Sequence, residues 1–149
     1  MLFRSRAFKA TSITEGFKEG TWVIKKYLES ASEIIKATQE TEESHKKKSV
    51  QMHYLARNFA SQLKEQIEKE QLTGFGTTFE YKKVFMGKTD SGEFVSIEEY
   101  IDGDFIKYIN NNGKVCAKGT VCDKTQAFVH LTHEKSEGKL VVQIGRAHV

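Results

Sequence analysis

Two stretches of the sequence place side chains and backbone groups where they could bind an anionic or flat polar ligand. The first, residues 21–28, is the strongest run of strand-forming residues in the chain and sets Lys25 among bulky apolar neighbours. The second, residues 97–113, begins as a strand, breaks at an acidic turn containing glycine and restarts as a short aromatic segment. Lys25 could cover the sheet with its stem or hold its ammonium over a phosphate. The acidic turn could bind a ligand or simply be solvated.

The hydrophobic periodicity predicts an α+β fold in which helices pack on an antiparallel sheet. Strands are expected within residues 1–10, 21–28, 79–86, 93–101 and 140–142. Helices are expected at residues 32–43, at 49–71 and from Asp123 onward. The strands at 79–86 and 93–101 are separated only by a turn, so they should pair antiparallel.

The helix at 49–71 has the clearest pattern, because its apolar residues recur at steps of three and four. These residues are Met52, Leu55, Ala56, Phe59, Leu63 and Ile67. We expect this stripe to be core. The basic run Lys46, Lys47 and Lys48 before it is expected to be a solvated helix start. Trp22 and Tyr100 are expected to be core residues.

Composition excludes several classes of protein. The chain has 149 residues, 38% hydrophobic and 29% charged, which is typical of one globular domain. Its formal charge of +3 is mild, so neither nucleic acid nor an anionic membrane is an expected partner. No apolar run approaches the ~20 residues that span a bilayer, so membrane insertion is not expected. Cys116 and Cys122 are predicted to be free thiols in a reducing compartment, which favours a cytoplasmic location.

Four motifs in this order resemble the α-kinase family of atypical Ser/Thr protein kinases, which includes elongation-factor kinase, myosin heavy chain kinase and channel-kinase types. They are VIKKYL at 23–28, Gln51-Met52, IEEYIDGDFIKYINNNG at 97–113 and AFVHLTHEKSEGKLVV at 127–142. The resemblance extends to Val142 and rests mainly on the last two motifs. It implies a protein-kinase-like fold of two lobes, which transfers the γ-phosphoryl group of ATP to serine or threonine of a protein substrate.

The resemblance also implies roles for individual residues. Lys25 matches the strand lysine that contacts the nucleotide phosphates, where a cation neutralises the transferring group. Glu98 matches the hinge residue whose backbone carbonyl meets the adenine amino group, and Ile101 matches the residue that offers its backbone amide. His130 matches the first ligand of a structural zinc. A lone helical histidine is more often a core residue. His133 could form a two-histidine metal site with His130, but the sequence shows no third ligand for it.

The end of the chain departs from the family pattern. Counted from His130 without a gap, the family's catalytic aspartate falls at Ile144, and the later aspartate that holds magnesium is absent. The 149-residue chain is therefore expected to be inactive, with Mg²⁺ and structural Zn²⁺ expected only in a complete domain. The DNA string ATC GGA AGA GCA CAC GTC TGA, part of a common sequencing adapter, translates as residues 144–149 followed by a stop codon. We expect residues 143–149 to be an adapter artefact and the protein to continue past Val142.

The resulting domain prediction has three parts. Residues 1–101 form a nucleotide-binding N-terminal lobe that is incomplete at its start, 102–142 form the hinge and the beginning of a C-terminal lobe, and 143–149 are artefact. One alternative is a non-catalytic, pseudokinase-like module that binds nucleotide or a partner. Another is a small basic domain that stacks nucleic-acid bases on exposed aromatics, which is disfavoured because most Phe and Tyr residues fall at core positions.

Overall fold

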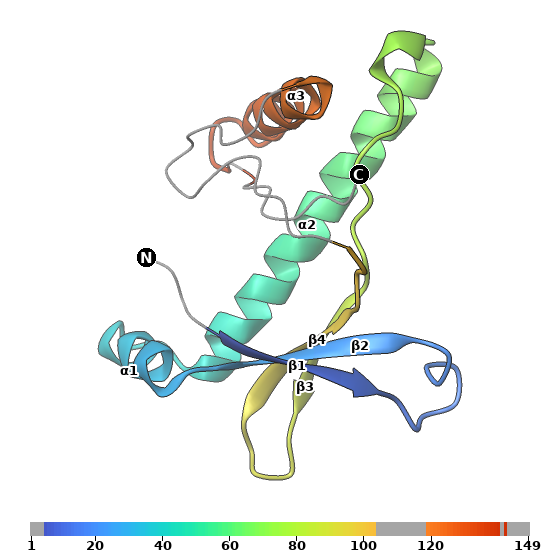
Figure 1. The fold of residues 1–149 in the computed structure, drawn as a ribbon. Coiled ribbons are helices and arrows are strands. Elements are labelled where there is room, and N and C mark those ends of the chain that lie inside the picture. Colours follow the sequence, from blue (N-terminus) through green and yellow to red (C-terminus); the bar gives the residue numbers. More distant parts are fainter. Residues whose placement is uncertain (1–4, 104–118, 141, 143–149) are drawn as a thin grey trace. The chain divides into compact units, whose positions relative to one another are not determined.

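The computed structural model describes residues 5–103, 119–140 and 142, and its chain forms two compact units (Figure 1). The first unit consists of Met1–Tyr54 and Lys82–Tyr100, and the second of Leu55–Tyr81 and Ile101–Val149. Some of the sequence predictions fall wholly or partly outside the described residues. These are the strand at 140–142, the aromatic segment after Asp104, Cys116 and Ile144. The lobe boundaries inferred from the sequence stay a prediction.

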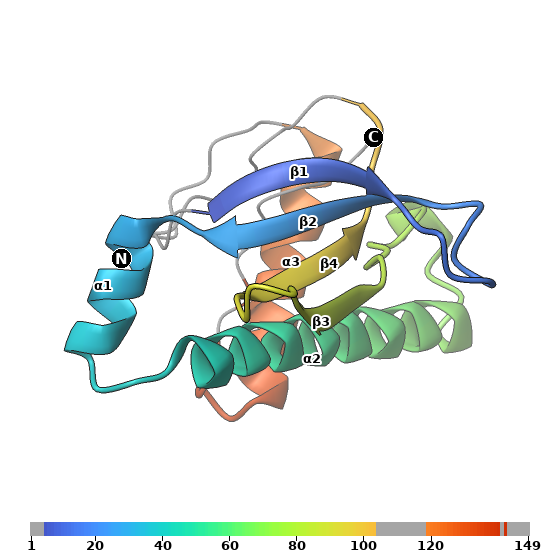
Figure 2. The ribbon, with the colours of Figure 1, turned by 90° about the horizontal axis from the view of Figure 1, so that it is seen from below.

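The first unit is built on a four-stranded antiparallel sheet. Its strands are β1 (Ser5–Thr11), β2 (Thr21–Tyr27), β3 (Val84–Lys88) and β4 (Phe94–Glu99). They lie in the order β1-β2-β4-β3, which Figure 2 shows side by side. The predicted antiparallel pairing of β3 with β4 is confirmed. Strand β1 begins at Ser5, the first residue described. Strand β3 begins at Val84 and not at the predicted Phe79, because residues 79–83 are not in a strand.

Helices α1 (Glu29–Ala37) and α2 (Glu42–Lys69) follow β2. The prediction for α2 missed its beginning, since the helix starts at Glu42 rather than near residue 49. Glu42 and Glu43 occupy the first turn, where carboxylates interact favourably with the helix dipole. The basic run that follows is therefore helical, and Lys46 within it is buried at 3% exposure instead of solvated.

The first part of α2 packs on the sheet face that carries Lys25 and Tyr27. The Tyr27 hydroxyl hydrogen-bonds to His45 Nδ1 at 2.6 Å. Further along α2, the Tyr54 hydroxyl donates to the Val84 carbonyl at 2.7 Å. These two contacts fix the beginning of the helix to β2 and to β3.

The opposite face of the sheet holds an aromatic cluster. The Trp22 ring, buried at 7% exposure as expected for a core residue, contacts Phe17 and Phe85 at centroid distances of 5.7 and 6.0 Å. Its Nε1 donates to the Phe17 carbonyl at 3.2 Å, which ties the β1–β2 loop to the sheet. A Cβ at Gly20 would lie 3.0 Å from that nitrogen, so a side chain there would disturb the contact.

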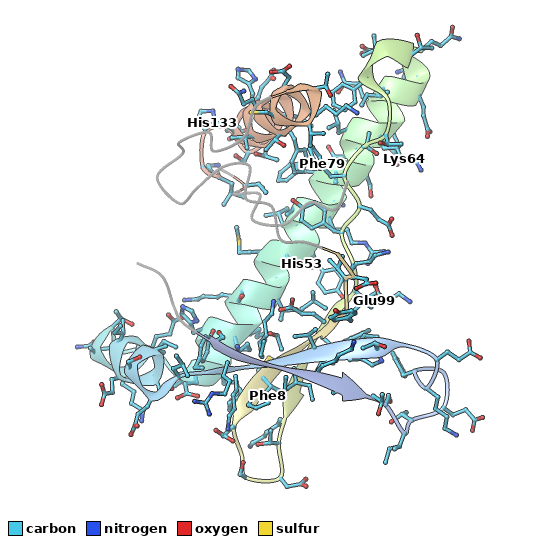
Figure 3. All side chains as sticks on the ribbon, in the orientation of Figure 1. Phe8, His53, Lys64, Phe79, Glu99 and His133 are labelled. Carbon is cyan, nitrogen blue, oxygen red and sulfur yellow. The ribbon has the colours of Figure 1, made fainter. Side chains whose placement is uncertain are left out.

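The second unit packs the later part of α2 against α3 (Thr120–Lys135). The core contains Phe59, Ala60 and Leu63 of α2 and Phe128 of α3. The predicted core stripe is confirmed at Phe59 and Leu63 but wrong at Met52 and Leu55, which are 46% and 37% exposed. Phe79 contacts Phe128 at a centroid distance of 5.4 Å, and Figure 3 shows it on the side of α2 that faces α3. A short 3-10 turn, η1 (Thr73–Phe75), follows α2. Helix α3 begins at Thr120, earlier than the predicted Asp123.

Phe128→Ala should lower the free energy of unfolding by about 3–5 kcal/mol, because the ring is fully buried and its loss leaves a cavity. Urea denaturation measures the change. The matched control is Phe8→Ala, since the Phe8 side chain on β1 is 43% exposed. Equal destabilisation by the two substitutions would contradict this account of the second unit's core.

Candidate functional site

An ion pair joins the two central strands of the first unit. The Lys25 Nζ and Glu98 Oε2 atoms lie 2.5 Å apart, and the two side chains are 20% and 24% exposed. The register of β2 on β4 sets Lys25 opposite Ser96 and places Glu98 opposite Val23. Lys25 and Glu98 are therefore diagonal neighbours on one face, within range of a long lysine side chain.

The Glu98 carboxylate is held at both oxygens. Oε2 accepts from Lys25, and Oε1 accepts from the Ser96 hydroxyl at 3.3 Å. A half-buried ammonium with a fixed carboxylate beside it is a preorganised cation. An incoming phosphate oxygen could take the place of the carboxylate, because both are anionic acceptors of comparable hydrogen-bond strength.

Lys46 of α2 adds a second cation to the same face. Its Nζ lies 3.7 Å from the centroid of the Tyr27 ring, an arrangement typical of a cation–π contact. Burial lowers the Lys46 pKa, while the Glu98 carboxylate raises it and the Lys25 ammonium lowers it. Burial also raises the pKa of Tyr27 to about 12, and Glu42 and Glu40 act in the same direction.

The sequence analysis did not identify Lys46 as a buried residue facing the sheet, although the spacing of residues on α2 indicates it. Lys46, Val50 and His53 recur at steps of four and three residues, which places them on one side of α2. His53 lies on the sheet side, since its Nε2 donates to the Lys82 carbonyl at 2.7 Å. The lysine run concealed this pattern, because three consecutive charges suggest a solvated segment.

The end of β4 has an irregular hydrogen-bond pattern at Glu99. The Glu99 amide donates to the Lys83 carbonyl at 3.1 Å, but the Lys83 amide donates to the Glu99 carboxylate Oε2 at 2.9 Å. In a regular ladder that amide would bond to the Glu99 backbone carbonyl. The carboxylate thus takes a partner that the carbonyl would otherwise have. His53 and Glu99 are labelled in Figure 3.

Glu98 itself lies inside the ladder, opposite Val23 of β2 and Val84 of β3. Its side chain contacts the Lys25 ammonium. Tyr100 is 38% exposed, so the prediction that it is a core residue is wrong. Ile101 follows it and is half-buried, at the beginning of the second unit's later segment.

His130 belongs to the second unit and is exposed on α3. It lines a groove of 260 Å³ together with Glu134 of α3 and with apolar residues that include Ile67, Leu72 and Phe75. Residues 5–103 and 119–140 contain no group of three or more His, Cys, Asp or Glu side chains arranged to hold a metal ion. The zinc role that the resemblance implies for His130 stays a prediction.

Comparison with known proteins decides the family. The sequence profile described as "Alpha-kinase family" matches residues 3–143, which is nearly the whole chain. The chain belongs to the alpha-kinase family. The resemblance read from the four motifs is thereby confirmed, and the α+β fold with its antiparallel sheet and packed helices agrees with the nucleotide-binding lobe of such a kinase.

Individual relatives match a shorter part of this alpha-kinase chain. It is 38% identical over 53 residues to transient receptor potential cation channel subfamily M member 6 of Mus musculus, and the match covers 35% of this chain. The Homo sapiens protein of the same name matches equally, at 38% over 53 residues. The chain covers only 3% of the length of either relative. In the part of the alpha-kinase that the structure describes, no helix is long and apolar enough to cross a membrane.

Glu98→Gln should lower the free energy of unfolding by about 1–3 kcal/mol, because it leaves the half-buried Lys25 ammonium without its charged partner. Urea denaturation of the single variants and of the Lys25→Met/Glu98→Gln double variant measures the coupling between them. Glu68→Gln is the control, since the Lys64–Glu68 pair is more than half exposed at both side chains. Additive effects of the two site substitutions would contradict the coupling.

Proposed function

We propose that this chain is part of an ATP-dependent protein serine/threonine kinase of the alpha type. The observation that supports the proposal most directly is the Lys25–Glu98 ion pair on the α2-covered face of a sheet that matches this family. Phosphoryl transfer requires a cation beside the phosphates of the nucleotide, and Lys25 is a half-buried ammonium on a rigid strand. Protein substrate and ATP are the partners, and a cytoplasmic location stays a prediction.

In this proposal Lys25 binds and orients the nucleotide phosphates. Its ammonium is held by Glu98 and exchanges that carboxylate for a phosphate oxygen when the nucleotide binds. Ser96 keeps a hydrogen bond to the other Glu98 oxygen, so the carboxylate stays nearby rather than moving into solvent. The contribution of Lys25 is electrostatic, since it neutralises charge that builds up on the transferring group.

The backbone pattern bears on the adenine contact. In an extended chain, the carbonyl of one residue and the amide of the residue two positions later point to the same side. The Glu99 carbonyl and the Ile101 amide satisfy this spacing, and the Lys83 amide is bonded to the Glu99 carboxylate instead of to that carbonyl. The Glu98 carbonyl belongs to the opposite side of the strand, toward β2. We therefore assign the adenine carbonyl contact to Glu99 in preference to Glu98, with Ile101 as the amide donor.

Lys25→Met should weaken ATP binding by about 10-fold or more, because one charge-assisted contact to phosphate is lost. Isothermal titration calorimetry of the 149-residue chain measures the affinity. Lys26→Met is the matched control, since the neighbouring Lys26 side chain lies on the other face of β2 and pairs with Glu93 at 3.2 Å. Equal losses for the two variants would overturn the assignment of Lys25.

The 149-residue chain should bind ATP without transferring phosphate, because Ile144 stands where the family's catalytic aspartate is expected. Incorporation of radioactive phosphate into a general substrate protein such as casein is the measurement. Phosphate incorporation in the presence of the Lys25→Met variant gives the background value. Phosphate incorporation that disappears in Lys25→Met would show that the chain is active and that this expectation is wrong.

A further inference from the structure

Lys46 is a largely buried residue whose ammonium has no ionic partner among the described residues. The residue as a whole is 3% exposed, but its Nζ is not among the buried side-chain atoms that lack a hydrogen-bond partner, since the described residues contain none. Some of the remaining exposure therefore lies at the ammonium, where a ligand can reach it. The Tyr27 ring covers one side of the ammonium, at 3.7 Å from Nζ to the ring centroid. A ring accepts a cation at its face and leaves the remaining N–H donors of the ammonium for other acceptors.

The position of Lys46 connects it to the Lys25–Glu98 pair. Tyr27 follows Lys25 by two residues on β2, so both side chains project from the same face at a separation of roughly 7 Å along the strand. The charges of Glu98, Lys25 and Glu42 all act on Lys46, and Glu42 does so without forming an ion pair. Two ammoniums and one fixed carboxylate thus share one face of the sheet.

A charge on a largely buried residue that lacks an ionic partner is partly desolvated, which is costly. A cation–π contact alone compensates only part of that cost. An anion with several negative oxygens would balance both lysines, since Glu98 can neutralise only one of them. A polyphosphate has this chemistry, and it is the group proposed above to contact Lys25.

We propose that Lys46 is a second cation of the phosphate site, contacting the polyphosphate of the bound nucleotide together with Lys25. This inference rests on the proposed function for the identity of the ligand. Tyr27 holds the Lys46 side chain in place through its ring, and His45 fixes the Tyr27 hydroxyl at 2.6 Å. The beginning of α2 therefore contributes to ligand binding as well as to packing.

The test measures calorimetric binding of ATP, adenosine and inorganic tripolyphosphate to the 149-residue chain and its variants. Lys46→Met should weaken ATP and tripolyphosphate about 10-fold or more and leave adenosine unchanged, while Lys46→Arg should retain most of the affinity. Lys47→Met is the matched control, because Lys47 is the exposed neighbour on the same helix. Lys46→Gln provides a second neutral variant if Lys46→Met fails to fold, which thermal unfolding would show.

The outcomes separate this inference from the proposed function. Unchanged ATP and tripolyphosphate affinity in Lys46→Met, or an equal loss for adenosine, would overturn the role of Lys46 and leave Lys25 and the kinase proposal standing. Tripolyphosphate binding that depends on Lys46, in a chain that binds neither ATP nor adenosine, would support the two-lysine anion site and remove the nucleotide proposal. A chain that binds none of the three probes would overturn both.

Discussion

The antiparallel register of β2 on β4 is the constraint on which the site depends. Because successive side chains of a strand alternate between faces, a slip of one residue would move Lys25 away from α2 and onto the face of the aromatic cluster. Several contacts oppose such a slip. Trp22, buried on that opposite face, would have to exchange places with Val23, and the Nε1 bond that ties the β1–β2 loop would be lost. Core packing on one face thus determines the chemistry of the other.

Helix α2 connects this sheet to the second unit through one continuous element, and its composition changes along its length. The first part carries His45, Lys46, His53 and Tyr54, whose polar groups interact with strand residues and backbone carbonyls. The later part carries Phe59, Ala60 and Leu63, which pack with Phe128 in an apolar core. A hydrophobic pattern detects only the later part, because the first part packs through aromatic and basic side chains.

This difference explains how much could be predicted from the sequence. The strand that carries Lys25 followed from residue types, and Phe59 and Leu63 of the second unit's core followed from the apolar stripe of α2. The burial of Lys46 could not be predicted in the same way, because it depends on a tertiary contact with Tyr27 and not on a local propensity. Residues 79–83 were predicted as strand from their composition. Phe79 and Tyr81 instead direct their rings toward Phe128, and β3 pairing begins only at Val84.

Glu98 and Glu99 show how adjacent residues of one type acquire different roles. Strand alternation places the Glu98 side chain on the α2 face, where it neutralises Lys25, and the Glu99 side chain on the other. The Glu99 carboxylate turns to its own strand edge and accepts the Lys83 amide, so the ladder between β3 and β4 loses one regular backbone bond at that point. The Glu99 backbone carbonyl, which has lost the Lys83 amide as its ladder partner, can accept a hydrogen bond from another group. Glu99 lies one residue before the end of the first unit's second segment. The sequence pair Glu-Glu alone cannot distinguish these roles; the register of β4 between β2 and β3 does so.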